Sequence, residues 1–167
     1  GDVNWIHDSF ETDSLPLYVG LDITSAVIEV NKQRFAHHVN KRFYFWDATK
    51  CTLPRVQDGE GEEKPFDLVH VRDVIQHMHL DQGVQFFCNV FKSGAQILIS
   101  TTYRTNRKNN NIHEEGGWYP NNLSAEPFSF PESDNCIPTH PNIEADDTCV
   151  YDLSEPWVKD FIATKCI

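Results

Sequence analysis

The sequence has 167 residues, with 25 acidic against 14 basic side chains and a formal net charge of −11. Its 40% hydrophobic and 12% aromatic residues supply enough apolar surface for one packed domain over residues 1–167 and exclude wholesale disorder. The acidic excess excludes nucleic-acid binding through a broad basic surface, and no stretch has the roughly 18 apolar residues of a membrane helix. We therefore expect a soluble, cytoplasmic protein with a small or uncharged substrate.

The five cysteines are widely spaced and form no C-x-x-C pair: Cys51, Cys88, Cys136, Cys149 and Cys166. Such a pair is the usual signature of a zinc or redox site. We expect ordinary reduced thiols and no metal site.

The first part of the chain alternates predicted strands with predicted helices. Residues 17–23 form an apolar run that contains Asp22 near its end, and Thr24 can begin a helix that continues to about residue 37. Residues 42–47 are an aromatic-rich strand that again ends in an acid, Asp47. Residues 57–64 are charged and predict a solvated loop without chemistry.

The same alternation continues to about residue 102. Residues 66–71 predict a third strand, followed by Arg72, Asp73 and a helical turn. Residues 80–91 predict an amphipathic helix and residues 94–102 a fourth strand. Strands with intervening helices indicate a doubly wound, mostly parallel sheet, in which ligands bind outside the carboxyl ends of the strands.

Beyond Tyr103 the composition changes to asparagine-rich and proline-rich sequence. Helices do not persist through prolines so spaced, so residues 104–147 predict a long irregular, lid-like insertion. The aromatic residues Trp118, Phe128 and Phe130 favour an ordered loop. A final antiparallel strand at 149–153 and a short helix at 157–162 complete the expected fold.

Asp22 and Asp47 are the first candidates for chemistry. In nucleotide-binding sheets a carboxylate at this position accepts both hydrogen bonds of a ribose diol, and Asp22 fits that task. Asp47, followed by Ala48, can accept a hydrogen bond from the amine of an adenine. The alternative is that each acid only caps the next helix. Two acids at one edge favour an adenosine pocket.

Four blocks of the sequence resemble the class I S-adenosylmethionine-dependent methyltransferases: residues 18–24 (YVGLDIT), 45–49 (FWDAT), 66–78 (FDLVHVRDVIQHM) and 94–103 (GAQILISTTY). A subgroup is matched more specifically by residues 1–5 (GDVNW), 116–123 (GGWYPNNL) and 127–131 (PFSFP), and loosely by 105–109. The resemblance implies a Rossmann-like fold with S-adenosylmethionine as cofactor.

The resemblance also assigns roles to residues. It implies that Asp22 holds the ribose hydroxyls with Ile23 beside the adenine, and that Asp47 and Ala48 recognise the adenine edge. Gly1 is then the last glycine of the loop beneath the methionine moiety. Arg72 and Asp73 contact the sulfonium end and the substrate, although a structural role at a helix start is an open alternative.

A catalytic base and substrate contacts complete the candidate site. His77 has an imidazole whose ordinary pKa lies near neutrality and follows Asp73 by about one helical turn, although helix histidines often only pack. Trp118, with Tyr103 and Tyr119, is expected to wall the substrate, and Arg107, with Arg104 and Lys108, to contact an anion. The alternative is that Trp118 anchors the loop and the basic residues are solvated.

The chain departs from the family pattern at its start. The family's first strand and first glycines have no counterpart, because the sequence begins with Gly1 where that loop ends. We therefore expect a segment upstream of Gly1. Three functions are open: methyl transfer to a small-molecule acceptor, an inactive remnant that serves as a binding or scaffold module, and a nicotinamide dehydrogenase, which the 47–48 and 116–123 motifs disfavour. The oligomeric state is left open.

Overall fold

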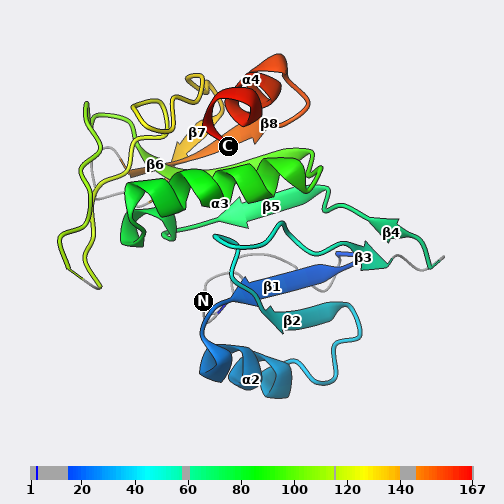
Figure 1. Cartoon of the computed structure of the whole chain (residues 1–167). Coiled ribbons are helices and arrows are strands. Elements are labelled where there is room, and N and C mark those ends of the chain that lie inside the picture. Colours follow the sequence, from blue (N-terminus) through cyan, green and yellow to red (C-terminus); the bar gives the residue numbers. More distant parts are fainter. Residues whose placement is uncertain (1–2, 4–14, 58–60, 115, 140–145, 167) are drawn as a thin grey trace. The chain divides into compact units, whose positions relative to one another are not determined.

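The computed structural model describes residues 3, 15–57, 61–114, 116–139 and 146–166. The chain forms two compact units, residues 1–47 and residues 48–167, and each is described by itself (Figure 1). The expectation of a single domain over residues 1–167 stays a prediction. Among the described residues, no helix combines the length and the hydropathy needed to cross a membrane.

The first unit contains the predicted strand, helix and strand. Strands β1 (Tyr18–Asp22) and β2 (Lys41–Phe45) pair in parallel from Tyr18 opposite Lys41 to Asp22 opposite Phe45. Helix α2 (Ser25–Arg34) connects them, and Thr24 is its N-cap residue, although the Thr24 side chain makes no capping hydrogen bond. The parallel pairing follows because the helix carries the chain back to the start of the sheet.

An aromatic contact packs α2 against this strand pair. The ring of Phe35, just after the helix, stacks on Phe43 of β2 with centroids 5.4 Å apart, and Val3 and Ile28 belong to the same buried cluster. A Cβ atom on Gly20 of β1 would lie 2.6 Å from the Phe43 ring. Only glycine at this position therefore lets the Phe43 ring lie against the backbone of β1.

The second unit is built on a four-stranded sheet in the order β5-β6-β8-β7. Its strands are β5 (Leu68–Val71), β6 (Ile97–Tyr103), β7 (Cys136–Pro138) and β8 (Asp146–Asp152). β5 and β6 are parallel, but β8 runs antiparallel to both β6 and β7. Within this unit the sheet is therefore mixed, because the described residues between β6 and β8 include no crossover helix. The final antiparallel strand is confirmed.

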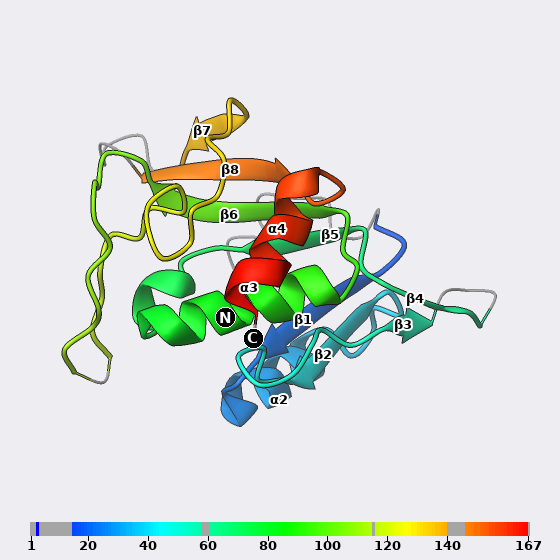
Figure 2. The ribbon, with the colours of Figure 1, turned by 45° about the horizontal axis from the view of Figure 1, so that its top comes forward.

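Two helices, α3 (Leu80–Lys92) and α4 (Pro156–Lys165), lie side by side over one face of this sheet (Figures 1 and 2). A chain of aromatic contacts holds them there. Phe91 of α3 packs edge-on against Phe161 of α4 at 5.1 Å between centroids, and Phe130 lies 4.8 Å from Phe87 and 5.0 Å from Trp157. The predicted helix at 80–91 and the terminal helix at 157–162 are thus confirmed, each within a few residues.

A short hairpin went unrecognised in the sequence. Strands β3 (Val56–Gln57) and β4 (Glu63–Lys64) pair antiparallel within the segment expected to be a loop. Their side chains are largely exposed, so the expected solvation is correct although the pairing was missed.

The described residues between β6 and β7 are irregular, whereas β7 itself and the start of β8 lie within the insertion expected at 104–147. Asparagine side chains fix the irregular part. The buried Asn109 amide donates to the carbonyls of Asn122 and Glu126 at 2.8 and 2.9 Å and accepts from the Asn122 N–H at 2.7 Å. Phe128 and Leu123 are buried beneath it. That this segment acts as a lid stays a prediction.

The expectation of reduced thiols throughout is wrong. Cys88 of α3 is bonded to Cys166 at the end of α4, and Cys136 of β7 to Cys149, which lies directly opposite on β8. Cys51 is the free cysteine of the described chain. The two pairs are 78 and 13 residues apart in sequence, and only the packing of α3 on α4 and the β7–β8 register bring them together.

Candidate functional site

Two carboxylates lie at the carboxyl edge of the first unit's strand pair. Asp22 is the last residue of β1, and Asp47 follows the end of β2 by two residues. The N–H of Trp46 donates to the carbonyl of Asp22 at 2.9 Å, which ties the two strand ends together. The sequence-based placement of both acids at one edge is thus confirmed.

The pKa of the Asp22 carboxyl group lies below its ordinary value. Burial acts to raise this pKa, and the hydrogen bond that the carboxylate accepts from the Thr24 N–H at 2.7 Å acts to lower it. The bond to Thr24 also serves the turn into α2, so the capping interpretation holds in part. Ile23 is 65% exposed beside this acid.

Two other residues, Ala48 and Gly1, are also expected to contact the cofactor. Ala48 begins the second unit, and its carbonyl accepts a hydrogen bond from the Asn89 side chain of α3 at 2.8 Å. Gly1 lies outside the described residues.

Polar residues also gather at the carboxyl ends of β5 and β6. Asp73 has a positive φ of 52°, and its N–H donates to the Thr101 hydroxyl of β6 at 3.3 Å. Its carboxylate accepts from the Gln76 amide at 2.8 Å and lies 3.5 Å from the Arg72 guanidinium. The expected pair at 72–73 is therefore built into the turn that leaves β5.

His77 ends the one-turn helix η2 (Ile75–His77), the helical turn expected from the sequence. Its side chain is exposed, and Nδ1 lies 3.1 Å from the carbonyl oxygen of Gly117. A carbonyl only accepts hydrogen bonds, so Nδ1 carries the proton in this contact, and in the neutral ring Nε2 keeps its lone pair. That is the protonation pattern that a general base needs.

Two of the aromatic residues that are expected to wall the substrate contact each other. Trp118 is 52% exposed, and its ring meets Tyr103 edge-on with centroids 5.5 Å apart. Burial, reinforced by Asp146 and Asp73, raises the pKa of Tyr103 to about 12, so its hydroxyl stays protonated at neutral pH. Phe128 and Phe130 of the same loop are buried, and the alternative that Trp118 anchors the loop to β6 through Tyr103 stays a prediction. Arg107 is exposed on that loop.

The candidates thus form two groups, one in each unit. Asp22, Ile23 and Asp47 share the edge of the first sheet, and Arg72, Asp73, His77, Tyr103 and Trp118 cluster around the ends of β5 and β6. Three buried polar residues of the second group, Gln76, Thr101 and Asn121, were missed. Their only signal in the sequence is that they fall inside the 66–78, 94–103 and 116–123 blocks.

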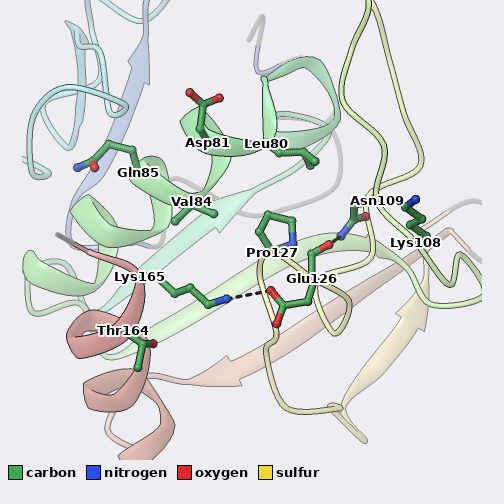
Figure 3. Close-up of a pocket in the computed structure, with 10 residues that line it drawn as sticks. All are labelled: Leu80, Asp81, Val84, Gln85, Lys108, Asn109, Glu126, Pro127, Thr164 and Lys165. Atoms are coloured by element: carbon green, nitrogen blue, oxygen red, sulfur yellow. Dashed lines mark hydrogen bonds and ion pairs between the residues drawn. The ribbon is translucent and has the colours of Figure 1, made fainter.

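An open groove lies elsewhere on the second unit. It has a volume of about 660 Å³ and is lined by residues of α3, the 108–109 and 126–127 segments and the end of α4 (Figure 3). Lys165 and Glu126 point toward one another in it and form an ion pair of 2.9 Å. Of the expected site residues, Lys108 alone lines this groove. The described residues include no group of three or more histidine, cysteine or acidic side chains placed to hold a metal.

Solved structures share this architecture. The PH0226 protein from Pyrococcus horikoshii OT3 matches 90% of this chain and 77% of its own, with a TM-score of 0.61 and 15% sequence identity. PigF with SAH matches 90% of this chain and 52% of its own, with a TM-score of 0.58 and 11% identity. The chain has their fold.

That fold confirms the expected Rossmann-like α/β class, whereas one doubly wound sheet stays a prediction. The chain spans 29% of the StiE O-MT segment and 42% of the N-methyltransferase NodS from Bradyrhizobium japonicum WM9, which it also matches. No protein-family model and no curated protein sequence matches the chain.

Proposed function

We propose that this protein transfers the methyl group of S-adenosylmethionine to a small-molecule acceptor. The observation that carries the proposal is the pair of carboxylates, Asp22 and Asp47, at one edge of two parallel strands. The fold adds support, because PigF, one of the structures that share it, was solved with SAH.

The first unit's residues fit the cofactor. The ionised Asp22 carboxylate can accept the two hydrogen bonds of a ribose diol, and Asp47 can accept one from the adenine amine. Ile23 presents an exposed apolar side chain for the adenine face. We keep Ala48 and Asp73, which belong to the second unit, and Gly1 as further proposed cofactor contacts.

The second unit supplies the groups for the acceptor. When bound, S-adenosylmethionine supplies a methyl group on a positively charged sulfur, which needs no further activation. The protein's own task is therefore to position the acceptor and to remove its proton. We assign Trp118, Tyr103 and Arg107 to positioning, His77 to taking the proton at Nε2, and Arg72 to holding the Asp73 carboxylate.

A calorimetric titration with S-adenosylhomocysteine tests the proposal. We expect the full chain to bind it. Asp22→Asn should weaken binding about 10- to 100-fold, because hydrogen bonds to a charged acceptor contribute about 1.5–3 kcal/mol. Asp47→Asn should weaken it less, since one hydrogen bond is lost.

The control is Asp134→Asn, because Asp134 is an exposed acid two residues before β7; this variant should bind like the wild type. If no titration gives heat above dilution, the inactive binding or scaffold module replaces the methyltransferase. Equal affinity of all variants would show that the two strand-end acids do not hold the ligand.

Partners and location are proposals of the same kind. We keep a small molecule as the partner and assign no role to nucleic acid or membrane. For location, the two disulfides favour an oxidising compartment, since cytosolic thiols are held reduced. The cytoplasmic location thus stays a prediction that the disulfides count against, and thiol trapping of the protein in its native cells would test it.

A further inference from the structure

Four hydrogen bonds join five residues at the carboxyl ends of β5 and β6, and the backbone from Tyr119 to Asn121 closes them into a ring. Gln76 donates its side-chain amide to Asp73, and the Asp73 N–H donates to the Thr101 hydroxyl. The Asn121 amide donates to the Thr101 carbonyl at 3.2 Å, and the Tyr119 N–H returns to the Gln76 carbonyl at 3.1 Å. We call these five residues the polar ring.

Three members of the polar ring carry polar atoms that it leaves unpaired. The side chains belong to Gln76, Tyr119 and Asn121, which are 2%, 4% and 0% exposed. Gln76 Oε1, the Tyr119 hydroxyl and Asn121 Oδ1 have no hydrogen-bond partner among the described residues. Such buried atoms are rare in folded proteins and lower the stability of the fold, so they point to a bound group.

The hydrogen bonds of the ring also fix which atoms are unpaired. The Asp73 carboxylate and the Thr101 carbonyl can only accept, so the amide nitrogens of Gln76 and Asn121 must face them. Two carbonyl oxygens are therefore left over. Burial raises the pKa of Tyr119 to about 12, so its hydroxyl stays neutral and can donate or accept. The complementary ligand presents N–H or O–H groups. A ligand with a carboxylate or phosphate in this place would be repelled by the two carbonyl oxygens.

Aromatic side chains border the polar ring. Trp118 immediately precedes Tyr119, is largely exposed and contacts Tyr103 at the end of β6. The Gly117 carbonyl, one residue earlier, is held by His77. A flat ligand against these rings would lie beside the candidate base.

We propose that Gln76, Tyr119 and Asn121 bind the N–H or O–H group of the small molecule that the protein methylates. The inference rests on the proposed function and adds the class of acceptor, an amine or a hydroxyl compound rather than an acid. Tyr119, which was expected to wall the substrate, is thus proposed to form a hydrogen bond with it instead.

The test uses three ring compounds without cofactor: phenol as the donor, anisole as the same ring without a donor, and benzoate as the acid. The readout is the pair of side-chain amide resonances of Gln76 and Asn121 in nitrogen-15 NMR of the full chain. We expect phenol to shift both, and anisole and benzoate to shift neither. Gln76→Met should weaken the phenol response at Asn121 at least tenfold, whereas Gln96→Met, at an exposed glutamine before β6, should not.

A stability measurement keeps the inference testable if a variant alters the fold. Tyr119→Phe removes a hydroxyl that no described residue pairs, so its Tm should equal or exceed that of the wild type, as for the exposed control Tyr44→Phe. A lower Tm would show that the hydroxyl is already satisfied, for example by an ordered water, and would overturn the inference. A phenol response that anisole or benzoate matches would also overturn the inference, and so would the absence of any response to phenol.

The two proposals fail separately. A selective phenol response without S-adenosylhomocysteine binding keeps the polar ring as a binding site and removes the methyl donor. Binding of S-adenosylhomocysteine without a phenol response overturns the further inference alone.

Discussion

His70 lies in β5, one residue before its end, and its surroundings disfavour the charged imidazole. Burial lowers the pKa of His70 below its ordinary value, the nearby Arg72 cation lowers it further, and Asp73 opposes both. The same two residues, Arg72 and Asp73, begin the candidate site. The charges of these two residues therefore also affect how the stability of the fold depends on the protonation of His70 in β5.

This pKa shift gives a pH-dependent stability. Below the ordinary pKa of about 6.5 the unfolded chain takes up a proton at His70 that the folded chain resists, so the free energy of unfolding falls as the pH drops. His70→Gln should flatten this fall. Urea unfolding at about pH 7.5 and about pH 5.5 measures it, and His113→Gln, at an exposed histidine, should leave the fall unchanged. An unchanged fall in His70→Gln would refute the assignment.

At the scale of elements, the segment between β6 and β7 shows how an irregular stretch can be rigid. It has no helix between residues 104 and 135 among those described, yet Asn109 and Asn122 satisfy its buried backbone groups. Leu123 donates its N–H to the Thr102 hydroxyl of β6 at 3.0 Å. The segment that carries Trp118 and Tyr119 is thus fastened to the sheet at the site.

Removal of the central asparagine tests this role. Asn109→Ala should lower the free energy of unfolding by about 2–3 kcal/mol, because buried carbonyls and the Asn122 N–H lose their partner. Asn110→Ala, at the exposed neighbour, should change it by less than about 0.5 kcal/mol. Denaturant unfolding of both variants measures the difference, and equal values would show that Asn109 does not hold the segment.

At the scale of the whole chain, two covalent links restrain the second unit. The Cys88–Cys166 bond encloses 78 residues and joins α3 to the end of α4, whereas Cys136–Cys149 encloses 13 residues across β7 and β8. A cross-link stabilises mainly by restricting the unfolded chain, and more so for a longer loop. The longer link should therefore contribute more.

Paired alanine replacements measure the two contributions. Removal of the disulfide that closes the 78-residue loop should lower the free energy of unfolding by about 4.5 kcal/mol on the chain-entropy relation. Removal of the disulfide that closes the 13-residue loop should lower it by about 3 kcal/mol. Thermal unfolding of Cys88→Ala/Cys166→Ala and of Cys136→Ala/Cys149→Ala gives both values. Cys51→Ser, at the exposed free cysteine, is the control. A smaller loss for the longer loop would contradict the entropic account.

The local elements could be predicted from the sequence because each is encoded by neighbouring residues. The apolar run before Asp22, the spacing of apolar residues along α3 and the aromatic strand before Asp47 each predict their own structure. The carboxyl-edge placement of Asp22 and Asp47 followed, because parallel strands joined by a helix end at the same edge. The hairpin β3–β4 was missed because two-residue strands carry no period.

Charge, composition and, apart from the β3–β4 hairpin, the strands and helices up to the end of β6 were thus determined by the sequence by itself, and with them the acidic candidates at the strand ends. The cysteine pairs, the short strand β7 and the polar ring were decided only by the tertiary structure. The reason is physical: each depends on which distant segments become neighbours. Gln76 and Asn121 are ordinary amides in the sequence, and only their fixed bonds to Asp73 and Thr101 leave two buried oxygens unpaired.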